Sequence, residues 1–399
     1  MMLQTFVRTG KLLALAAACC SLAGCWDMVE VNQLAIVDLV GMDREPGNGK
    51  YTTYYQVINP PGIAVQKGAG IKAPVYTYKV EGFSTVELAG KTFDIIPRRP
   101  FYDHYQALMV TERFAKEGLR EVLNFLEKRP DRRATIHLLV TDSPLPDMMK
   151  TYIPLERLPG RAEHSIIELQ SKYSGQESKR SRVKDLIENM EGSMLTVLPI
   201  VSLSGSKPMP TTKRYEQIDA NQGNFIMKGA AVFKHDRMIG RLEPSDLPWF
   251  YLLDGRIGML NEPLIVNGER VDLQAPKPEV HRQLVIVSGK PVLKMDIYAQ
   301  AQIYDNDQNV KLTEQNLAEI KAQFNGQVQK KASAFYEKTK RFGWDLLGIE
   351  AQMKRKPGKE WADIKKEEEI WKKTELQLAV HCTIRTIGTT IDPYKEKRG

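Results

Sequence analysis

The sequence predicts an α+β protein of more than one domain, with a mixed α/β N-terminal region and a C-terminal domain in which a long helix packs on an antiparallel sheet. Helix and strand signals alternate through the first half, as they do when helices and strands form layers. In the second half, two runs of alternating apolar and polar residues flank one long amphipathic segment. Residues 202–223 lack apolar periodicity and are rich in Ser, Gly, Pro and Thr. We therefore predict an N-terminal region at 25–201, a linker at 202–223, a C-terminal domain at 224–392 and a tail at 393–399.

The first 25 residues fit an export signal that ends in a lipidation site. Arg8 and Lys11 form a short basic region, and residues 12–20 form an apolar run that is too short to span a bilayer. The next motif, Leu22-Ala23-Gly24-Cys25, resembles the lipobox of a bacterial lipoprotein, where a thiol takes up a diacylglyceryl group. An ordinary signal peptide with a chance cysteine accounts less well for this motif. We expect cleavage of residues 1–24, lipidation of Cys25 and stable anchoring by the acyl chains.

Charge and cysteine content limit the classes of partner. The formal net charge of +8 falls to +6 once Arg8 and Lys11 leave with the signal. A mild positive excess suits a protein beside anionic lipid headgroups. The sequence lacks the aromatic-and-basic pattern of a nucleic-acid-binding module, so we expect no nucleic-acid partner. Cys382 would be the remaining thiol beside the lipidated Cys25, which leaves no intramolecular disulfide and no Cys-rich zinc site.

The N-terminal region opens with strands and a capped helix. Runs of β-forming residues predict strands at 51–59 and 75–81. Ser84 and Glu87 fit a capping box, which predicts that a helix starts at Ser84. The apolar residues on one face of this helix are Val86, Ala89 and Phe93.

The rest of the N-terminal region reads as alternating helix and strand. A second helix is expected at about 112–128, a short apolar strand at 134–141 and charged helical stretches across 162–191. The apolar positions at helical spacing in the second helix are Leu119, Val122, Leu123 and Leu126.

The C-terminal domain has the clearest patterns. Apolar and polar residues alternate over 293–303 and again over 376–384, which predicts two strands that each have one buried face. Antiparallel pairing is expected, because sheets with one wet face are usually antiparallel. Thr313 is placed to cap a long helix between the two strands. The buried stripe of that helix is expected to be Leu317, Ile320, Phe324, Val328 and Phe335.

No catalytic or metal-binding motif emerges from the residues. Gly90-Lys91-Thr92 resembles the end of a phosphate-binding loop, but Thr85 stands where that loop requires glycine. No Gly-x-Ser-x-Gly elbow occurs, and no histidine pair has the spacing of a zinc-binding helix. His137 reads as a core or edge residue, while His381 and Cys382 should point to opposite faces of one strand. We expect no enzymatic activity, no cofactor and no metal.

The densest polar and aromatic segment is 97–105. Arginine and tyrosine are favoured at protein interfaces, so this segment is a candidate partner surface. A loop whose aromatic residues simply pack on the core explains it equally well. The residues of the candidate surface are Arg98, Arg99, Tyr102 and His104.

Several segments together resemble one family, the Ger(x)C lipoproteins, which are the C subunits of bacterial spore nutrient-germinant receptors. The resemblance covers nearly the whole chain after the signal, although the turn at Asp345–Ile349 departs from the family's usual pattern. The segments that carry it are Gly24–Asp27, Glu30–Val37, Gly41–Asp43, Gln56–Pro60, Arg99 to His104, Phe114–Leu119, Lys228–Phe233, Gly240–Leu242, Phe342–Asp345, Trp361 and Trp371.

The resemblance implies a non-enzymatic subunit on the outer face of the spore's inner membrane. Such a subunit would act with two integral-membrane subunits to detect amino acids, sugars or nucleosides and trigger germination. It also implies a mixed α/β fold, and Cys25 is the residue whose chemical role it supplies.

A second hypothesis is a solute-binding lipoprotein of an uptake system. The length of the chain and the lipid anchor both suit it. The C-terminal half, however, lacks the repeated β-α alternation of a second doubly wound lobe. Direct nutrient binding is the property that separates the two hypotheses.

Overall fold

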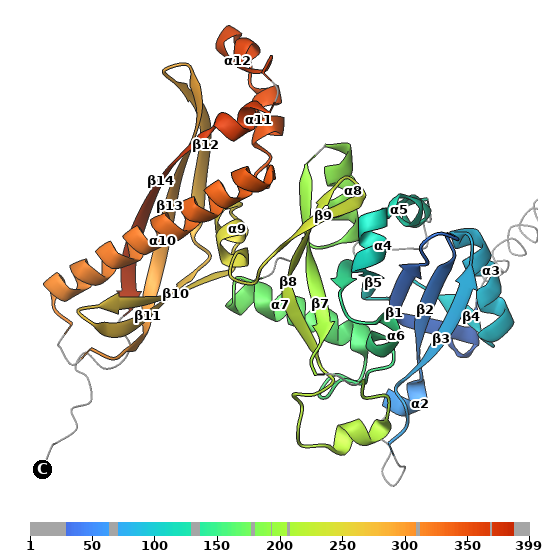
Figure 1. Ribbon diagram of the computed structural model, residues 1–399. Helices are drawn as coiled ribbons and strands as arrows, with labels where there is room; N and C mark the ends of the chain where they lie inside the picture. The colour runs from blue at the N-terminus through green and yellow to red at the C-terminus, as the bar shows by residue number, and fades with distance from the viewer. Residues whose placement is uncertain are drawn as a thin grey trace, which may run out of the picture.

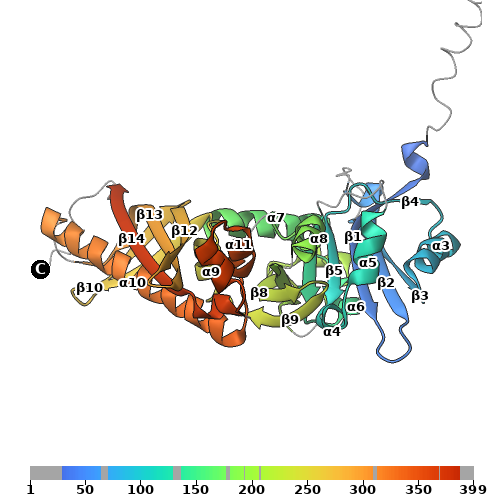
Figure 2. The same cartoon turned by 90° about the horizontal axis from the view of Figure 1, so that it is seen from above.

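Two sheets organise the chain in this computed structural model, which describes residues 29–63, 71–128, 136–176, 180–192, 194–205, 208–308, 312–367 and 369–386. One sheet has nine strands and the other has five. Figure 1 shows them side by side, and Figure 2 shows an elongated molecule with one sheet towards each end. We call residues 29–242 the N-terminal lobe and residues 247–386 the C-terminal lobe. The predicted α+β class is confirmed.

The N-terminal sheet has a parallel centre and antiparallel flanks. Its order is β3-β2-β1-β5-β6-β7-β8-β9, and β4 pairs with the start of β1. The pairs among β1, β5, β6 and β7 are parallel, and the outer pairs are antiparallel. The strands are β1 (Leu34–Arg44), β2 (Tyr51–Ile58), β3 (Val75–Gly82), β4 (Arg99–Phe101), β5 (Ala107–Thr111), β6 (His137–Thr141), β7 (Leu195–Leu203), β8 (Phe225–Lys234) and β9 (Arg237–Leu242).

Helices cover both faces of this sheet. Successive side chains of a strand point to opposite faces, so Leu108 and Val110 of β5 pack with α4, α5 and α8, while Ala107 and Met109 pack with α6 and α7. This double cover explains why the central strands are continuously apolar rather than alternating. The helices are η1 (Val31–Gln33), α2 (Pro60–Ile63), α3 (Thr85–Ile95), α4 (Glu112–Glu117), α5 (Arg120–Glu127), α6 (Leu145–Met148), α7 (Pro159–Tyr173), α8 (Val183–Glu191) and η2 (Thr212–Glu216).

Two predicted N-terminal elements differ in detail. The helix expected at 112–128 is two helices, because Gly118 adopts a φ of 122° that breaks the ladder between α4 and α5. The four apolar residues expected on it are buried all the same. The face of α3 that carries Val86 and Phe93 is exposed, and the helix instead buries Thr85, Leu88 and Thr92.

Strand pairing crosses the segment that the sequence marks as a linker. β7 and β8 lie on either side of 202–223, and they pair with each other along most of their length. β8 pairs in turn with β9. The polar segment is therefore an excursion between two neighbouring strands of one sheet, and the chain enters the C-terminal lobe only after β9. Residues 202–223 are rich in polar residues because the segment is largely exposed at the end of a hairpin, not because it separates two sheets.

The C-terminal sheet is built around one 17-residue strand, β13. β11 and β12 pair antiparallel with successive parts of β13, and β10 pairs with β11. The alternation predicted for 293–303 is confirmed, because the apolar residues from Leu293 to Ile303 are all buried. The elements of this lobe are α9 (Leu247–Leu253), β10 (Met259–Val266), β11 (Glu269–Pro276), β12 (Glu279–Val287), β13 (Lys290–Asn306), α10 (Glu314–Phe342), α11 (Ile349–Arg355), α12 (Lys359–Ile364), η3 (Ile370–Lys373) and β14 (Glu375–Thr386).

The long helix α10 crosses the apolar face of the sheet and returns the chain to the edge of β13 (Figure 1). Thr313 caps it as predicted, because its hydroxyl accepts a hydrogen bond from the backbone N of Asn316 at 3.2 Å. The expectation of antiparallel pairing for the last strand is wrong, since β14 runs parallel to β13. A helix that spans the sheet lengthwise brings the next strand back in the original direction, which is the β-α-β arrangement.

The two lobes meet through glycines that leave no space for a side chain. A Cβ on Gly258 would lie 1.8 Å from the carbonyl oxygen of Ser171 at the end of α7. A Cβ on Gly240 of β9 would lie 2.2 Å from the ring of Trp344. Asn261 of β10 also donates from Nδ2 to the carbonyl of Tyr173 at 3.0 Å. These close contacts position one lobe against the other.

Candidate functional site

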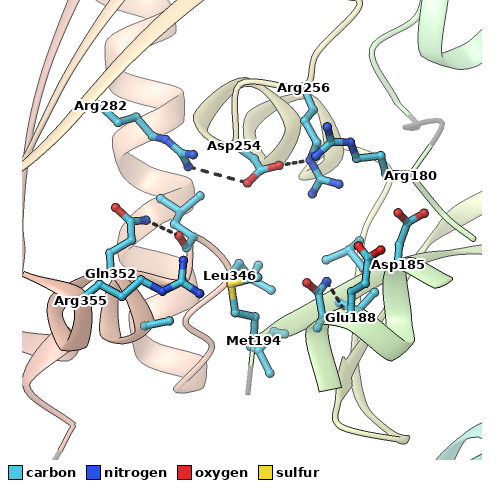
Figure 3. Close-up of a pocket in the computed structure, with 17 residues that line it drawn as sticks. Arg180, Asp185, Glu188, Met194, Asp254, Arg256, Arg282, Leu346, Gln352 and Arg355 are labelled. Atoms are coloured by element: carbon cyan, nitrogen blue, oxygen red, sulfur yellow. Dashed lines mark hydrogen bonds and ion pairs between the residues drawn. The ribbon is translucent and has the colours of Figure 1, made fainter. Parts of the chain in front are cut away.

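A cavity of about 300 Å³ lies where the lobes meet. One wall is α8 with the start of β7, and the other is formed by α11, the loop before it, Arg282 of β12 and the turn after α9 (Figure 3). Clefts between domains are a preferred location for small-molecule sites. The cavity is therefore the first candidate site.

Charged side chains dominate the C-terminal wall. Asp254 forms an ion pair with Arg256, and its other oxygen lies 3.8 Å from Nη1 of Arg282. Burial lowers the pKa of Arg282 because a guanidinium is disfavoured away from water. Among the residues that the structure describes, Arg355 forms no ion pair, although it lines the same cavity. The C-terminal wall therefore carries more positive than negative charge, because Asp254 alone cannot neutralise its arginines.

The opposite wall carries two carboxylates, with Arg180 beside them. Asp185 and Glu188 of α8 face the arginines across the cavity in Figure 3. Asp185 accepts from Nε and Nη2 of Arg182 at 2.9 and 3.1 Å, so its charge is held by a neighbour on its own helix. Asn189 donates to the hydroxyl of Thr196 at 3.0 Å. The arginines of the C-terminal wall and the carboxylates of α8 together would suit a small molecule that carries both an acidic and a basic group.

A rigid turn forms the floor. Asp345 accepts from the backbone N atoms of Ile349 and Glu350 at 2.8 and 2.7 Å, which fixes the start of α11. Burial raises the pKa of Asp345, partly offset by these hydrogen bonds. Gly348 has a φ of 63°, and a Cβ there would lie 3.1 Å from Sδ of Met194 on the other lobe. This is the turn where the sequence departs from the family pattern.

The predicted partner surface, Arg98 to His104, lies at the far end of the N-terminal lobe and takes no part in the cavity. Arg98 and Arg99 are exposed beside the pairing of β4 with β1. Tyr102 packs inward, with its ring 6.0 Å from that of Tyr55. His104 is exposed and lies 5.6 Å from the ring of Phe101. The segment therefore has exposed arginines, as expected of a partner surface, and one aromatic residue packed on the core, as expected of a connecting loop.

The remaining thiol and histidine predictions can be placed as well. Cys382 packs against the core of the C-terminal lobe, and burial raises the pKa of its thiol to about 11. His381 is exposed on the opposite face, stacked 4.8 Å from the ring of Tyr298. His137 is buried, and burial lowers its pKa to about 4. Within the described ranges, no cluster of His, Cys, Asp and Glu could hold a metal ion.

Comparison with known proteins assigns the chain on both of its halves. A profile described as "Spore germination protein N-terminal domain" matches residues 27–203. A second, described as "Spore germination B3/GerAC like, C-terminal", matches residues 228–388. This chain belongs to the spore germination GerAC family. The gap between the two matches overlaps the predicted linker, even though the sheet continues across it.

Relatives in this family align with nearly the full chain. Spore germination protein KC of Bacillus subtilis is 24% identical over 388 residues, which cover 94% of this chain and 95% of the relative. Putative spore germination protein YfkR of the same organism is 22% identical over 380 residues, 93% of this chain and 94% of the relative. The crystal structure of the GerBC protein matches the fold with a TM-score of 0.55 at 16% identity, covering 86% of this chain and 96% of that one.

For this GerAC-family chain, the predicted lipidation site Cys25 lies outside the described residues. No helix in the described part is both long and apolar enough to cross a membrane. Sequence reasoning missed the cavity, because its lining comes from four segments separated by many residues: 180–197, 254–256, 282 and 346–355. No local motif marks any of these segments as a shared site.

Proposed function

We propose that this chain is a lipid-anchored, non-enzymatic subunit of a spore nutrient-germinant receptor. In this proposal it lies on the outer face of the inner spore membrane and acts with two integral-membrane subunits to trigger germination. Membership of the germination family over both halves of the chain carries the proposal. The lipobox-like motif at Cys25 supplies the means of anchoring.

The environments of the candidate catalytic side chains support a non-enzymatic role. A thiol with a pKa near 11 is protonated at neutral pH and is a poor nucleophile. Cys382 and His381 also lie on opposite faces of β14, so they cannot act as a pair. The polar side chains that line the cavity are arginines, carboxylates, amides and Thr196, beside several apolar residues, and among the described residues its lining includes no serine, cysteine, lysine or histidine.

Deletion of the gene tests the proposal. Spores that lack the chain should fail to germinate with the nutrient that the receptor detects, while vegetative growth and sporulation proceed normally. Expression of the intact gene from a second locus should restore the response. Normal nutrient germination in the deletion strain, with no related subunit present, would refute the proposal.

The anchor has its own test. Cys25→Ala should release the chain into the soluble fraction and weaken nutrient germination, because tethering raises the effective concentration of the chain beside membrane partners. Cys382→Ala is the matched control, since it removes the other thiol and should leave membrane fractionation unchanged. A released Cys25→Ala chain that supports full germination would contradict the role of the tether.

The cavity favours a second candidate function, which is capture of a small solute as in a solute-binding lipoprotein. Arg355 forms no ion pair within the described chain and faces Asp185 and Glu188 across the cavity. This arrangement fits a small zwitterion such as an amino acid, with its carboxylate at the arginine and its ammonium group at the carboxylates. Calorimetry of the unlipidated chain with individual amino acids tests this function. Binding that is lost in Arg355→Ser but kept in Lys354→Ser, one residue away on α11, would support it. If no amino acid gives a binding heat, solute capture is refuted and only the receptor-subunit function remains.

A further inference from the structure

The outer face of α3 exposes apolar residues that a surface helix ordinarily buries. Val86 and Phe93 are 69% and 66% exposed, and they lie seven residues apart, on the same face two turns along the helix. Phe83, directly before the helix, is 62% exposed. Large exposed apolar side chains that cluster usually mark an interaction surface. We call Val86, Phe93 and the flanking Phe83 the α3 face.

This face lies at the end of the molecule where the described chain begins. Ile96, just after α3, is buried in one cluster with Ala35. Three residues later, Arg99 pairs with Leu34 at the start of β1. Both views show α3 at the end of the N-terminal lobe away from the C-terminal lobe (Figures 1 and 2). The α3 face is therefore close to the point where the chain leaves towards Cys25.

Chain length sets how far this end can be from a lipid anchor. Leu34 lies nine residue steps after Cys25, and a fully extended chain of that length reaches about 30 Å at most. This step rests on the lipid anchor of the proposed function. Given that anchor, the start of β1 lies within about 30 Å of the lipid, with α3 near it, whereas the C-terminal lobe extends from the opposite end of the N-terminal lobe.

The charges near the α3 face include the exposed Asp94 next to Phe93 and two arginines after the helix that could meet anionic lipids. Arg98 and Arg99 are exposed, and neither forms an ion pair within the described ranges. Lys91 on the helix is paired with Glu87 at 2.6 Å. Unpaired arginines beside exposed aromatic residues are the combination that holds proteins at the lipid headgroup layer.

We propose that the α3 face lies on the surface of an anionic phospholipid bilayer. Phe93 and Val86 enter the headgroup layer, and Arg98 and Arg99 contact lipid phosphates. The lipid on Cys25 holds the chain at the membrane, and the α3 face fixes which side of the N-terminal lobe is turned towards it. A stable lipid anchor and a second, weaker contact together give one orientation, which a single flexible tether does not.

A fluorescent probe on the face tests this orientation. The mature chain carries Cys25→Ser and Cys382→Ser, a histidine tag at its N-terminus and Val86→Cys labelled with a polarity-sensitive dye. It is held on vesicles that contain nickel-chelating lipid, with or without phosphatidylglycerol. The dye emission should shift to the blue on phosphatidylglycerol vesicles, and lipid-borne quenchers should reduce it. Ile265→Cys in the C-terminal lobe, where Ile265 is 63% exposed, is the matched control and should not respond.

Partitioning of the untagged chain separates the two kinds of contact. Arg98→Ser with Arg99→Ser should lower partitioning onto phosphatidylglycerol vesicles about thirtyfold, since each basic residue near such a surface contributes about 1 kcal/mol. Val86→Ser with Phe93→Ser should lower it at least about tenfold by removing apolar insertion. Ile265→Ser with Tyr304→Ser, at positions 63% and 73% exposed, should change it little. All variants should keep the unfolding temperature of the parent, because the substituted side chains are exposed.

The outcomes distinguish this proposal from the one on which it rests. A probe at position 86 that stays in water on every vesicle overturns the membrane-facing orientation, and the same result follows if the face binds a partner protein instead of lipid. In that case the deletion and Cys25→Ala phenotypes still decide the receptor-subunit proposal. Conversely, a blue shift together with normal germination of the deletion strain supports the bilayer contact and refutes the receptor role.

Discussion

Glu163 on α7 is a carboxylic acid in an unusual environment. It is fully buried, and neither of its oxygens has a hydrogen-bond partner in the described part of the chain. Burial raises its pKa to about 8. The nearby Asp38 is also buried, but it accepts a hydrogen bond from the backbone N of Gly160 at 2.7 Å. Because this donor stabilises the carboxylate, the pKa of Asp38 rises only to about 6. The folded protein thus keeps Glu163 protonated near neutral pH.

This environment predicts a pH-dependent stability. Between about pH 4.5 and pH 8 the folded state binds a proton at Glu163 that the unfolded state releases, so stability falls as pH rises through this window. Glu163→Met keeps the shape and removes the acid, and should raise the free energy of unfolding by roughly 2–3 kcal/mol at pH 7.5 and by much less at pH 5. Urea unfolding at the two pH values measures the difference. An equal effect at both, or none, would show that the carboxyl is not buried as described.

The sequence could not reveal this residue. Glu163 stands in a helix with Arg161, His164 and Glu168, so the segment reads as a charged helix, as we predicted. Whether one of these residues is buried depends on the tilt of α7 over β1 and on the close approach at Gly160, where a Cβ would lie 2.4 Å from the carbonyl of Asp38. Such contacts join residues far apart in the chain and leave no local pattern.

At the scale of elements, α10 depends on its N-terminal cap. Thr313→Ala removes the acceptor for the backbone N of Asn316 and should lower the free energy of unfolding by about 1 kcal/mol. Thr313→Asn restores an acceptor and should recover most of the loss. Chemical unfolding of the three chains measures both effects. Equal destabilisation by alanine and asparagine would mean that the cap hydrogen bond is not what the threonine contributes.

In the C-terminal lobe, local sequence patterns predicted the helices and strands better than they predicted how the strands pair. The cap, four of the five predicted stripe residues of α10 and both alternating strands follow from spacing within each segment, while Leu317 is only partly buried. The direction of β14 does not follow from local spacing. It is set by the 29-residue helix α10, which spans the sheet before β14 begins. The helix expected at 112–128 fails for a similar reason, since it breaks where the backbone N of Leu119 donates to the carbonyl of Asp236 on a distant turn.

At the scale of the whole molecule, the lobes are held by contacts that exclude side chains. Gly258→Ala places a methyl group against the carbonyl of Ser171, and Gly240→Ala places one against Trp344. Each should cost roughly 1–3 kcal/mol of stability and increase the radius of gyration, because the backbone or ring must move apart. X-ray scattering and urea unfolding measure the two effects.

Gly326→Ala on α10 is the control for these substitutions. In the described part of the chain, no atom outside its own helix turn lies within 4 Å of the point that the new methyl group would occupy. Its backbone is helical, so alanine should stabilise the chain by up to about 1 kcal/mol. If the interface variants keep both the parent radius and the parent stability, the lobes are not held by these contacts.

The whole-molecule arrangement was the least predictable level. The family resemblance anticipated a mixed fold along the full chain, and both family matches agree with it. The sheet that continues through β8 and β9, the cavity between the lobes and the outward turn of the α3 face all depend on tertiary contacts. An apolar stripe such as Val86 and Phe93 looks the same in sequence whether it meets a core or a membrane.

The pairing of β14 with β13 also has a consequence for biogenesis. The chain is synthesised from its N-terminus, so β13 becomes available before residues 375–386 can pair with it. Until then one edge of β13 is an open template for strands of other chains, which is a known route to aggregation. The C-terminal lobe can close only when synthesis is nearly complete. A premature stop before Glu375 should therefore yield a chain that needs a chaperone or is degraded, rather than a shorter functional protein.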